Sequence, residues 1–139
     1  MCTSKAFIFS VMSFTILFGM TCWAGNEQVK PEQKDWNDYI GQADTNIGMK
    51  ERADEAKTSL NRRMAKIIQK LRSHLDSEQK DLFTKAQKAW REKTKAECSL
   101  VASRFRGGTH EGLEYRVAHI NEIKSRINEL LKLVKLFAP

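Results

Sequence analysis

Proline stands only at positions 31 and 139 of this chain, so the whole tract between them can form helix without interruption. Apolar residues recur along the tract every three or four positions, which is the spacing of one face of an α-helix. No stretch alternates polar and apolar residues as a half-buried strand would. The sequence therefore predicts an all-α fold.

Two local signals divide the tract into three helical segments. Residues 76–79 read DSEQ, a capping-box pattern in which Asp76 accepts from the first amides of a new helix and Gln79 reaches back. A glycine pair at 107–108 supplies the second break, because glycine tolerates the left-handed backbone of a helix end. Thr109 is the expected cap of the third segment.

Three long helices joined by tight breaks form an antiparallel bundle, which we expect over residues 45–137. Trp90 and Cys98 lie two turns apart on one face of the middle helix, so both should point inward. Leu82 and Ala86 fall on the same predicted stripe. The core predicted from the stripes comprises Leu60, Ile68, Leu71, Phe83, Trp90, Cys98, Phe105, Ile127 and Leu130.

Residues 25–44 mix Gly, Pro and amide side chains, which is typical of a flexible leader. The leader contains one apolar cluster, formed by Trp36, Tyr39 and Ile40. We expect this cluster to form a short N-terminal helical segment that docks on the bundle.

Residues 1–24 have the pattern of a signal peptide. One lysine precedes an apolar run at 6–20, which is shorter than the roughly 20 residues that cross a bilayer. Cys22 and Ala24 place small side chains at the −3 and −1 positions, so we predict cleavage after Ala24 and export to the periplasm or the extracellular space. Two alternatives stay open: a retained N-terminal anchor, and a lipoprotein with Cys22 as its lipidated N-terminus.

Lys and Arg outnumber Asp and Glu by 24 to 17, a net charge of +7, and loss of residues 1–24 would remove one lysine and leave +6. Such a protein attracts anionic surfaces, with a strength that falls as salt rises. The candidate anion- or partner-binding residues are Arg62, Arg63, Lys66 and Lys70, here called the basic set, in which like charges repeat at i,i+4 without stabilising the helix. An ordinary solvated basic surface is the alternative. Nucleic acid is not an expected partner, because the chain has no recognised binding motif.

The sequence offers no convergent set of catalytic or ligand groups. His74, His110 and His119 stand in separate contexts, and none pairs with another at a metal-ligand spacing. No serine or cysteine lies in a nucleophile elbow. Pairing of Cys98 with His110 or His119 is conceivable, but separate core and surface positions are the simpler interpretation. We predict a protein that is not an enzyme and has no catalytic, cofactor-binding or metal site.

The order of the motifs resembles a known family. AQKAW at 86–90, Cys98 eight residues after its tryptophan, the glycine break and EIKSRINELL at 122–131 are similar to the small exported helical domain at the N-terminus of LprI-type lysozyme inhibitors. The resemblance covers roughly residues 45–135. The matching positions are Leu60, Asn61, Ile68, Leu71, Ala86, Gln87, Ala89, Trp90, Cys98, Gly107, Gly108, Arg126, Glu129 and Leu130.

The cysteines depart from the family pattern. The resemblance implies further cysteines near the start of the first long helix and in the last one, where this chain has Arg52 and Ala118. Cys98 then corresponds to one half of a bridge without its partner. It is either a buried thiol or a link between two chains, and the oligomeric state stays open.

The resemblance implies an exported, non-catalytic binding protein of the cell envelope, of lysozyme-inhibitor type, whose partner is an envelope protein such as a lysozyme. The positive charge opposes this partner, because lysozymes are commonly basic. The alternative is an envelope-surface module that binds anionic lipid or polymer through the basic set.

Overall fold

The computed structural model describes residues 35–138, which form an all-α fold with no strand among them. The helices are α1 (Trp36–Gly41), α2 (Asn46–His74), α3 (Ser77–Ala102), a 3-10 turn η1 (Ser103–Phe105) and α4 (Glu111–Phe137). The predicted bundle of three long helices with a short N-terminal helix is confirmed. The predicted signal peptide and the first half of the leader, residues 25–34, lie outside the described residues.

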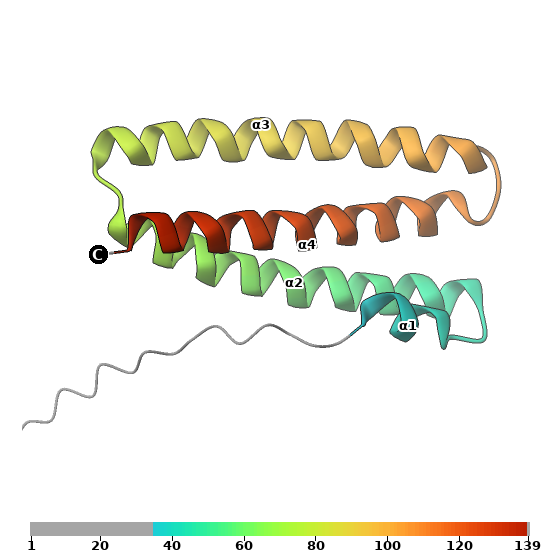
Figure 1. Cartoon of the computed structure of the whole chain (residues 1–139). Helices are drawn as coiled ribbons and strands as arrows, with labels where there is room; N and C mark the ends of the chain where they lie inside the picture. Colours follow the sequence, from blue (N-terminus) through green and yellow to red (C-terminus); the bar gives the residue numbers. More distant parts are fainter. Residues whose placement is uncertain (1–34, 139) are drawn as a thin grey trace, which may run out of the picture.

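The three long helices run up, down and up, and α4 lies between α2 and α3 (Figure 1). The most extensive contact joins α2 to α4, a smaller one joins α3 to α4, and α1 packs on α2. Helices α2 and α3 meet mainly near the turn that connects them (Figure 1). Hence α4 is the central helix, and α3 is covered from one side only.

Both breaks form by local hydrogen bonds. The capping box at the start of α3 is confirmed: the backbone N–H of Gln79 donates to Asp76 Oδ1 at 2.8 Å, and the Asp76 N–H donates to Gln79 Oε1 at 3.0 Å. At the second break Gly107 adopts a φ of 78°, which favours glycine. The predicted Thr109 cap is wrong, because α4 begins at Glu111, whose side chain instead accepts from the Gly107 N–H at 3.0 Å.

Most of the predicted core lies inside. The buried members are Leu60, Leu71, Phe83, Cys98, Ile127 and Leu130. Trp90 and Ile68 are half-buried and pack against the core. The prediction that Phe105 belongs to the core is wrong, because its side chain is 39% exposed. Its helix ends at Ala102, and the following 3-10 turn moves later positions off the helical stripe.

The inner face of α3 is narrower than its apolar spacing indicates. Leu82 and Ala86, expected on the inward stripe, are exposed, and Leu82 is 58% exposed. The buried residues of α3 instead form a single stripe that faces α4: Phe83, Gln87, Thr94, Cys98 and Ala102. Because only α4 covers this helix, one stripe is all that it buries.

Candidate functional site

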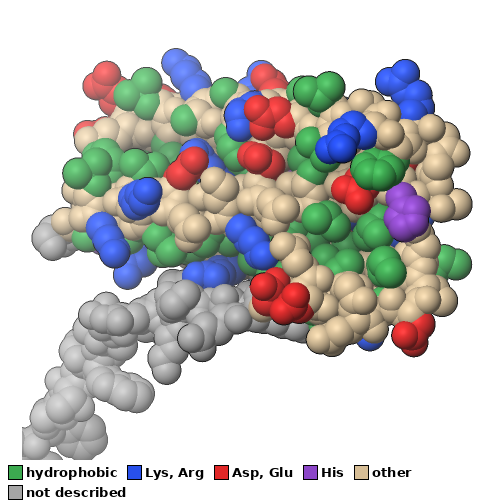
Figure 2. All heavy atoms as spheres, turned by 45° about the vertical axis from the view of Figure 1, so that its right-hand side comes forward, with side chains coloured by type: hydrophobic (Ala, Val, Ile, Leu, Met, Phe, Trp, Pro, Cys, Tyr) green, Lys and Arg blue, Asp and Glu red, His purple; other side chains and the backbone are tan. Residues whose placement is uncertain are grey.

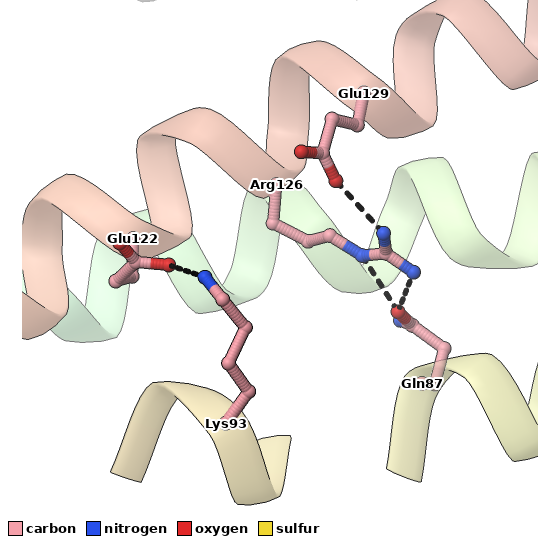
Figure 3. Close-up of polar contacts among 5 residues, drawn as sticks. All are labelled: Gln87, Lys93, Glu122, Arg126 and Glu129. Carbon is pink, nitrogen blue, oxygen red and sulfur yellow. Dashed lines mark hydrogen bonds and ion pairs between the residues drawn. The ribbon is translucent and has the colours of Figure 1, made fainter. Parts of the chain in front are cut away.

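A polar bridge ties α3 to α4 in the middle of the bundle (Figure 3). Arg126 on α4 donates from Nε and Nη2 to the side-chain oxygen of Gln87 on α3, at 2.8 and 2.6 Å. Its Nη1 donates to Glu129 at 2.8 Å, and its guanidinium lies 5.8 Å from the centre of the Trp90 ring. Gln87 is 6% exposed and the Arg126 side chain 12% exposed, so this group is enclosed and not a free binding site.

One turn further along α3, Lys93 makes two ion pairs. Its ammonium lies 2.7 Å from Glu97 on the same helix. It also lies 3.6 Å from Glu122 on α4, the pair drawn in Figure 3. These carboxylates raise the pKa of the lysine. Exposed ion pairs contribute little to stability because water and salt screen them, so Lys93 adds little to the fold.

Cys98 is a buried free thiol, with 1% of its surface exposed. It lines a groove of about 300 Å³ between α3 and α4, beside Val117, Ala118 and Glu122. Burial raises the pKa of the thiol first, and the charges of Glu122 and Glu97 raise it further. A thiol with a raised pKa holds little thiolate, so Cys98 is a packing residue and a poor nucleophile.

The histidines stay apart from this thiol. The ring centre of His119 lies 6.0 Å from that of Tyr115. Burial lowers the pKa of His119, and the positive charge of Lys57 on α2 lowers it further. His110 is exposed just before α4. Across residues 35–138, no three His, Cys, Asp or Glu side chains gather in a way that could hold a metal ion.

The basic set lies on α2. Arg62, Lys66 and Lys70 are exposed and follow one another at single-turn steps, so they share one face of the helix. Arg63 is half-buried, and its buried Nε has no hydrogen-bond partner among the described atoms. None of the four forms an ion pair within residues 35–138.

The bundle divides by charge along its length. The half around the α2–α3 turn, residues 61–90 and 126–138, holds eleven Lys and Arg against four Asp and Glu, a net charge of +7. The other half, residues 35–60 and 91–125, holds ten against eleven, a net charge of −1. We call these the turn half and the loop half. Antiparallel folding thus collects the positive excess of the described chain at one end, although charged and hydrophobic side chains are interspersed on the face in Figure 2.

An apolar groove of about 250 Å³ opens in the turn half, where all three long helices meet. Most of its wall is formed by Leu71 of α2, Leu75 directly after α2, Leu82 and Phe83 of α3, and Phe137 of α4. The adjoining Leu136 is 73% exposed. In residues 35–138 no helix has the length and apolar character that a membrane span requires.

Comparison with protein families gives one match. A family described as "Lysozyme inhibitor LprI" matches residues 37–130, which is more than half of the chain. The chain belongs to the LprI lysozyme inhibitor family. This confirms the resemblance found in the sequence, and it identifies the chain at family level with inhibitors rather than enzymes. No curated protein and no solved structure matches the chain significantly.

Four of the residues that carry the LprI resemblance lie in the contact between α3 and α4. Gln87, Trp90 and Arg126 form the bridge between α3 and α4, and Cys98 packs in the same interface. Their spacing carries the resemblance to the family, whereas no local pattern indicated that the Gln87 side-chain oxygen would accept hydrogen bonds from Arg126.

The two positions where the LprI pattern implies further cysteines also lie at helix contacts. Arg52 donates to the backbone oxygen of Tyr39 at 2.8 Å and lies 4.9 Å from its ring centre, which fixes α1 on α2. Ala118 lines the groove that Cys98 also lines, so α4 approaches α3 where the resemblance places a cysteine. At these two positions this chain has an arginine and an alanine, both in helix contacts.

Proposed function

We propose that this chain is an exported, non-catalytic binding protein of the cell envelope that inhibits a lysozyme by covering its cleft or the approach to it. Membership of the LprI lysozyme inhibitor family is the observation that carries the proposal. A bundle of long packed helices supports it, because an inhibitor that acts by occupation gains affinity when it loses little freedom on binding. The buried thiol and the separated histidines leave no convergent reacting group among the described residues.

The charge division favours one end of the bundle as the surface that meets a basic lysozyme. The turn half, at +7, would repel such an enzyme, whereas the loop half, at −1, would not. Exposed carboxylates lie there, including Asp44 just before α2 and Glu51 in its second turn. We therefore place the lysozyme-facing surface on the loop half, around the start of α2.

A lytic assay tests this assignment. The full chain, produced with its own N-terminal segment and purified from the cell envelope, is titrated against several lysozymes acting on cell walls. We expect inhibition of at least one of them, and about a ten-fold weaker inhibition for Asp44→Lys combined with Glu51→Lys, since lost rim attraction slows association. Neither side chain forms an ion pair within residues 35–138, so both replacements should fold.

The matched control carries two reversals in the turn half, Arg62→Glu with Lys66→Glu. It should inhibit as well as the original protein or better, because it lowers the repulsion. The proposed lysozyme-facing surface would be contradicted if Arg62→Glu with Lys66→Glu weakened inhibition while Asp44→Lys with Glu51→Lys left it unchanged. Absence of inhibition of every lysozyme would contradict the function.

A second candidate function is binding to an anionic envelope surface, lipid or polymer, and the charge of the turn half favours it. The basic set lies in this half, is mostly exposed and forms no ion pair within the described chain. Retention on anionic vesicles should then fall steeply with added salt and with Arg62→Glu plus Lys66→Glu. The double variant Asp44→Lys with Glu51→Lys should leave retention on the vesicles unchanged or increase it. Retention that salt does not alter would count against this function.

A further inference from the structure

We propose that two copies of this chain associate through the outer face of α3, with the two α3 helices antiparallel. The occupant of this face is a second copy of the same chain. The inference holds whether or not the protein inhibits a lysozyme, because it rests on the exposed surface of α3, the apolar groove and the charge division of the bundle.

The outer face of α3 carries a regular seam that its own chain leaves uncovered. The seam residues are Leu82, Ala86, Ala89, Lys93, Ala96 and Leu100. They follow one another at steps of four, three, four, three and four, the spacing of a coiled-coil seam. All six are exposed, with Leu82 at 58% and Leu100 at 72%. In Figure 1 this helix forms one edge of the bundle and has only α4 beside it.

The seam is symmetric about its centre, which is what a two-fold interface between identical chains requires. When α3 lies antiparallel to a second α3, Leu82 faces Leu100 of the other copy and Ala86 faces Ala96. Ala89 then faces Lys93, and each pair is centred on position 91. The three alanines allow the helices to approach closely. Lys93 can lay its stem along the seam while its ammonium stays at the rim with Glu97 and with Glu122 of its own α4.

The apolar groove of the turn half fits this arrangement. Leu82 and Ala86 belong both to the seam and to the groove wall. In the antiparallel register Leu100 of the second copy arrives beside Leu82, at the mouth of the groove. The groove, of about 250 Å³, has room for a leucine side chain. The interface thus contains two equal contacts, in which the Leu100 of each copy enters the groove of the other.

Charge selects the antiparallel orientation over the parallel one. Antiparallel helices set the turn half of each copy, at +7, against the loop half of the other, at −1. Parallel helices would set the two turn halves together, and like charges across an interface are strongly unfavourable.

The size of the seam predicts a weak dimer. From Leu82 to Leu100 the strip is about 27 Å long at 1.5 Å per residue, and a helix face about 10 Å wide covers about 270 Å² on each copy, or about 540 Å² over two copies. That area is below the roughly 1,000 Å² of a stable specific interface, so we expect a transient dimer with a dissociation constant of about 10 µM to about 1 mM.

Cross-linking tests the register and the orientation together. Single variants Ala86→Cys and Ala96→Cys of the full chain are oxidised separately and as a mixture at about 100 µM, a concentration within the expected range. The mixture should form mixed disulfide dimers at least about ten-fold faster than either variant alone, since like positions are about 15 Å apart along the antiparallel helices. The original protein, whose thiol is buried, serves as the blank, and Arg91→Cys on the opposite side of α3 serves as the matched control.

Sedimentation of Leu100→Glu provides the second measurement. The original protein should shift from monomer to dimer over the expected concentration range, whereas Leu100→Glu should stay monomeric with unchanged helical circular dichroism, because Leu100 is exposed. Faster cross-linking within one variant than in the mixture would overturn the antiparallel register. A monomer at all concentrations would overturn the dimer and leave the seam to a different protein.

Discussion

The side chain of Asp76 caps the start of α3 at the α2–α3 turn. Its carboxylate and the Gln79 amide satisfy two N–H groups that otherwise have no partner at the start of α3. We expect Asp76→Ala to lower the free energy of unfolding by about 1 kcal/mol, with an unchanged urea m-value. Urea titration measures both quantities. Ser77→Ala, next to it and outside the capping box, should change stability by much less, and an equal loss in both variants would contradict the capping role.

His119 makes stability depend on pH. Burial, and then the charge of Lys57, lowers its pKa below the ordinary 6.5, while Glu122 acts in the opposite direction. The unfolded chain therefore binds more protons near pH 6, so the contribution of this residue is complete above about pH 6.5 and is lost as the pH falls toward the folded pKa. We expect the urea concentration at the midpoint of unfolding to decrease as the pH is lowered from 8 to 5.

The control for this pH dependence is a pair of glutamine variants. His119→Gln should flatten the decrease, whereas the exposed His110→Gln should retain it. A decrease of the same size in His119→Gln would assign the pH dependence to other groups.

At the scale of the helices, the sequence predicted where each helix breaks but not which face of α3 is buried. The capping box and the glycine pair are local signals, so they could be identified from their own residues. Leu82 and Ala86 were placed inward because apolar residues on both sides of a helix merge into one broad stripe. Periodicity cannot tell whether one neighbour or two will cover a helix. That depends on α4 lying between α2 and α3, a long-range arrangement.

The contact of α3 with α4 predicts that one cysteine would restore a covalent link. Cys98 and Ala118 line the same groove, so Ala118→Cys should form a disulfide with Cys98 during export to an oxidising compartment. Closing a loop of about 20 residues should stabilise the fold by about 3 kcal/mol, with strain lowering that figure. Thiol titration and thermal unfolding with and without reductant measure the bond and its effect. Ala118→Ser is the control, and two free thiols after export would contradict the expected geometry.

At the scale of the whole molecule, the resemblance and the candidate surfaces come mostly from different residues, and only Ala86 and Ala89 of the seam belong to both. Gln87, Trp90, Cys98 and Arg126 identify the family and are held in the α3–α4 contact. The sequence could therefore predict the fold, the family and the basic set as a candidate surface, while the seam and the charge division had to come from the structure. The seam and the charge division both arise when distant segments pack side by side.

Net charge leads to a prediction about how the protein meets a basic lysozyme. The chain carries +7, or +6 after loss of residues 1–24, so the two proteins repel at long range even when they bind through complementary patches. Added salt shortens the reach of this repulsion, to about 8 Å at physiological ionic strength. We therefore expect the association rate constant to rise as salt increases from about 10 to about 150 mM, a range over which the Debye length falls several-fold. Stopped-flow fluorescence measures this rate. For Arg62→Glu with Lys66→Glu the association should be faster at low salt and its rise with salt smaller. A rate constant that falls with salt would mean that local attraction at the loop half outweighs the charge of the whole chain.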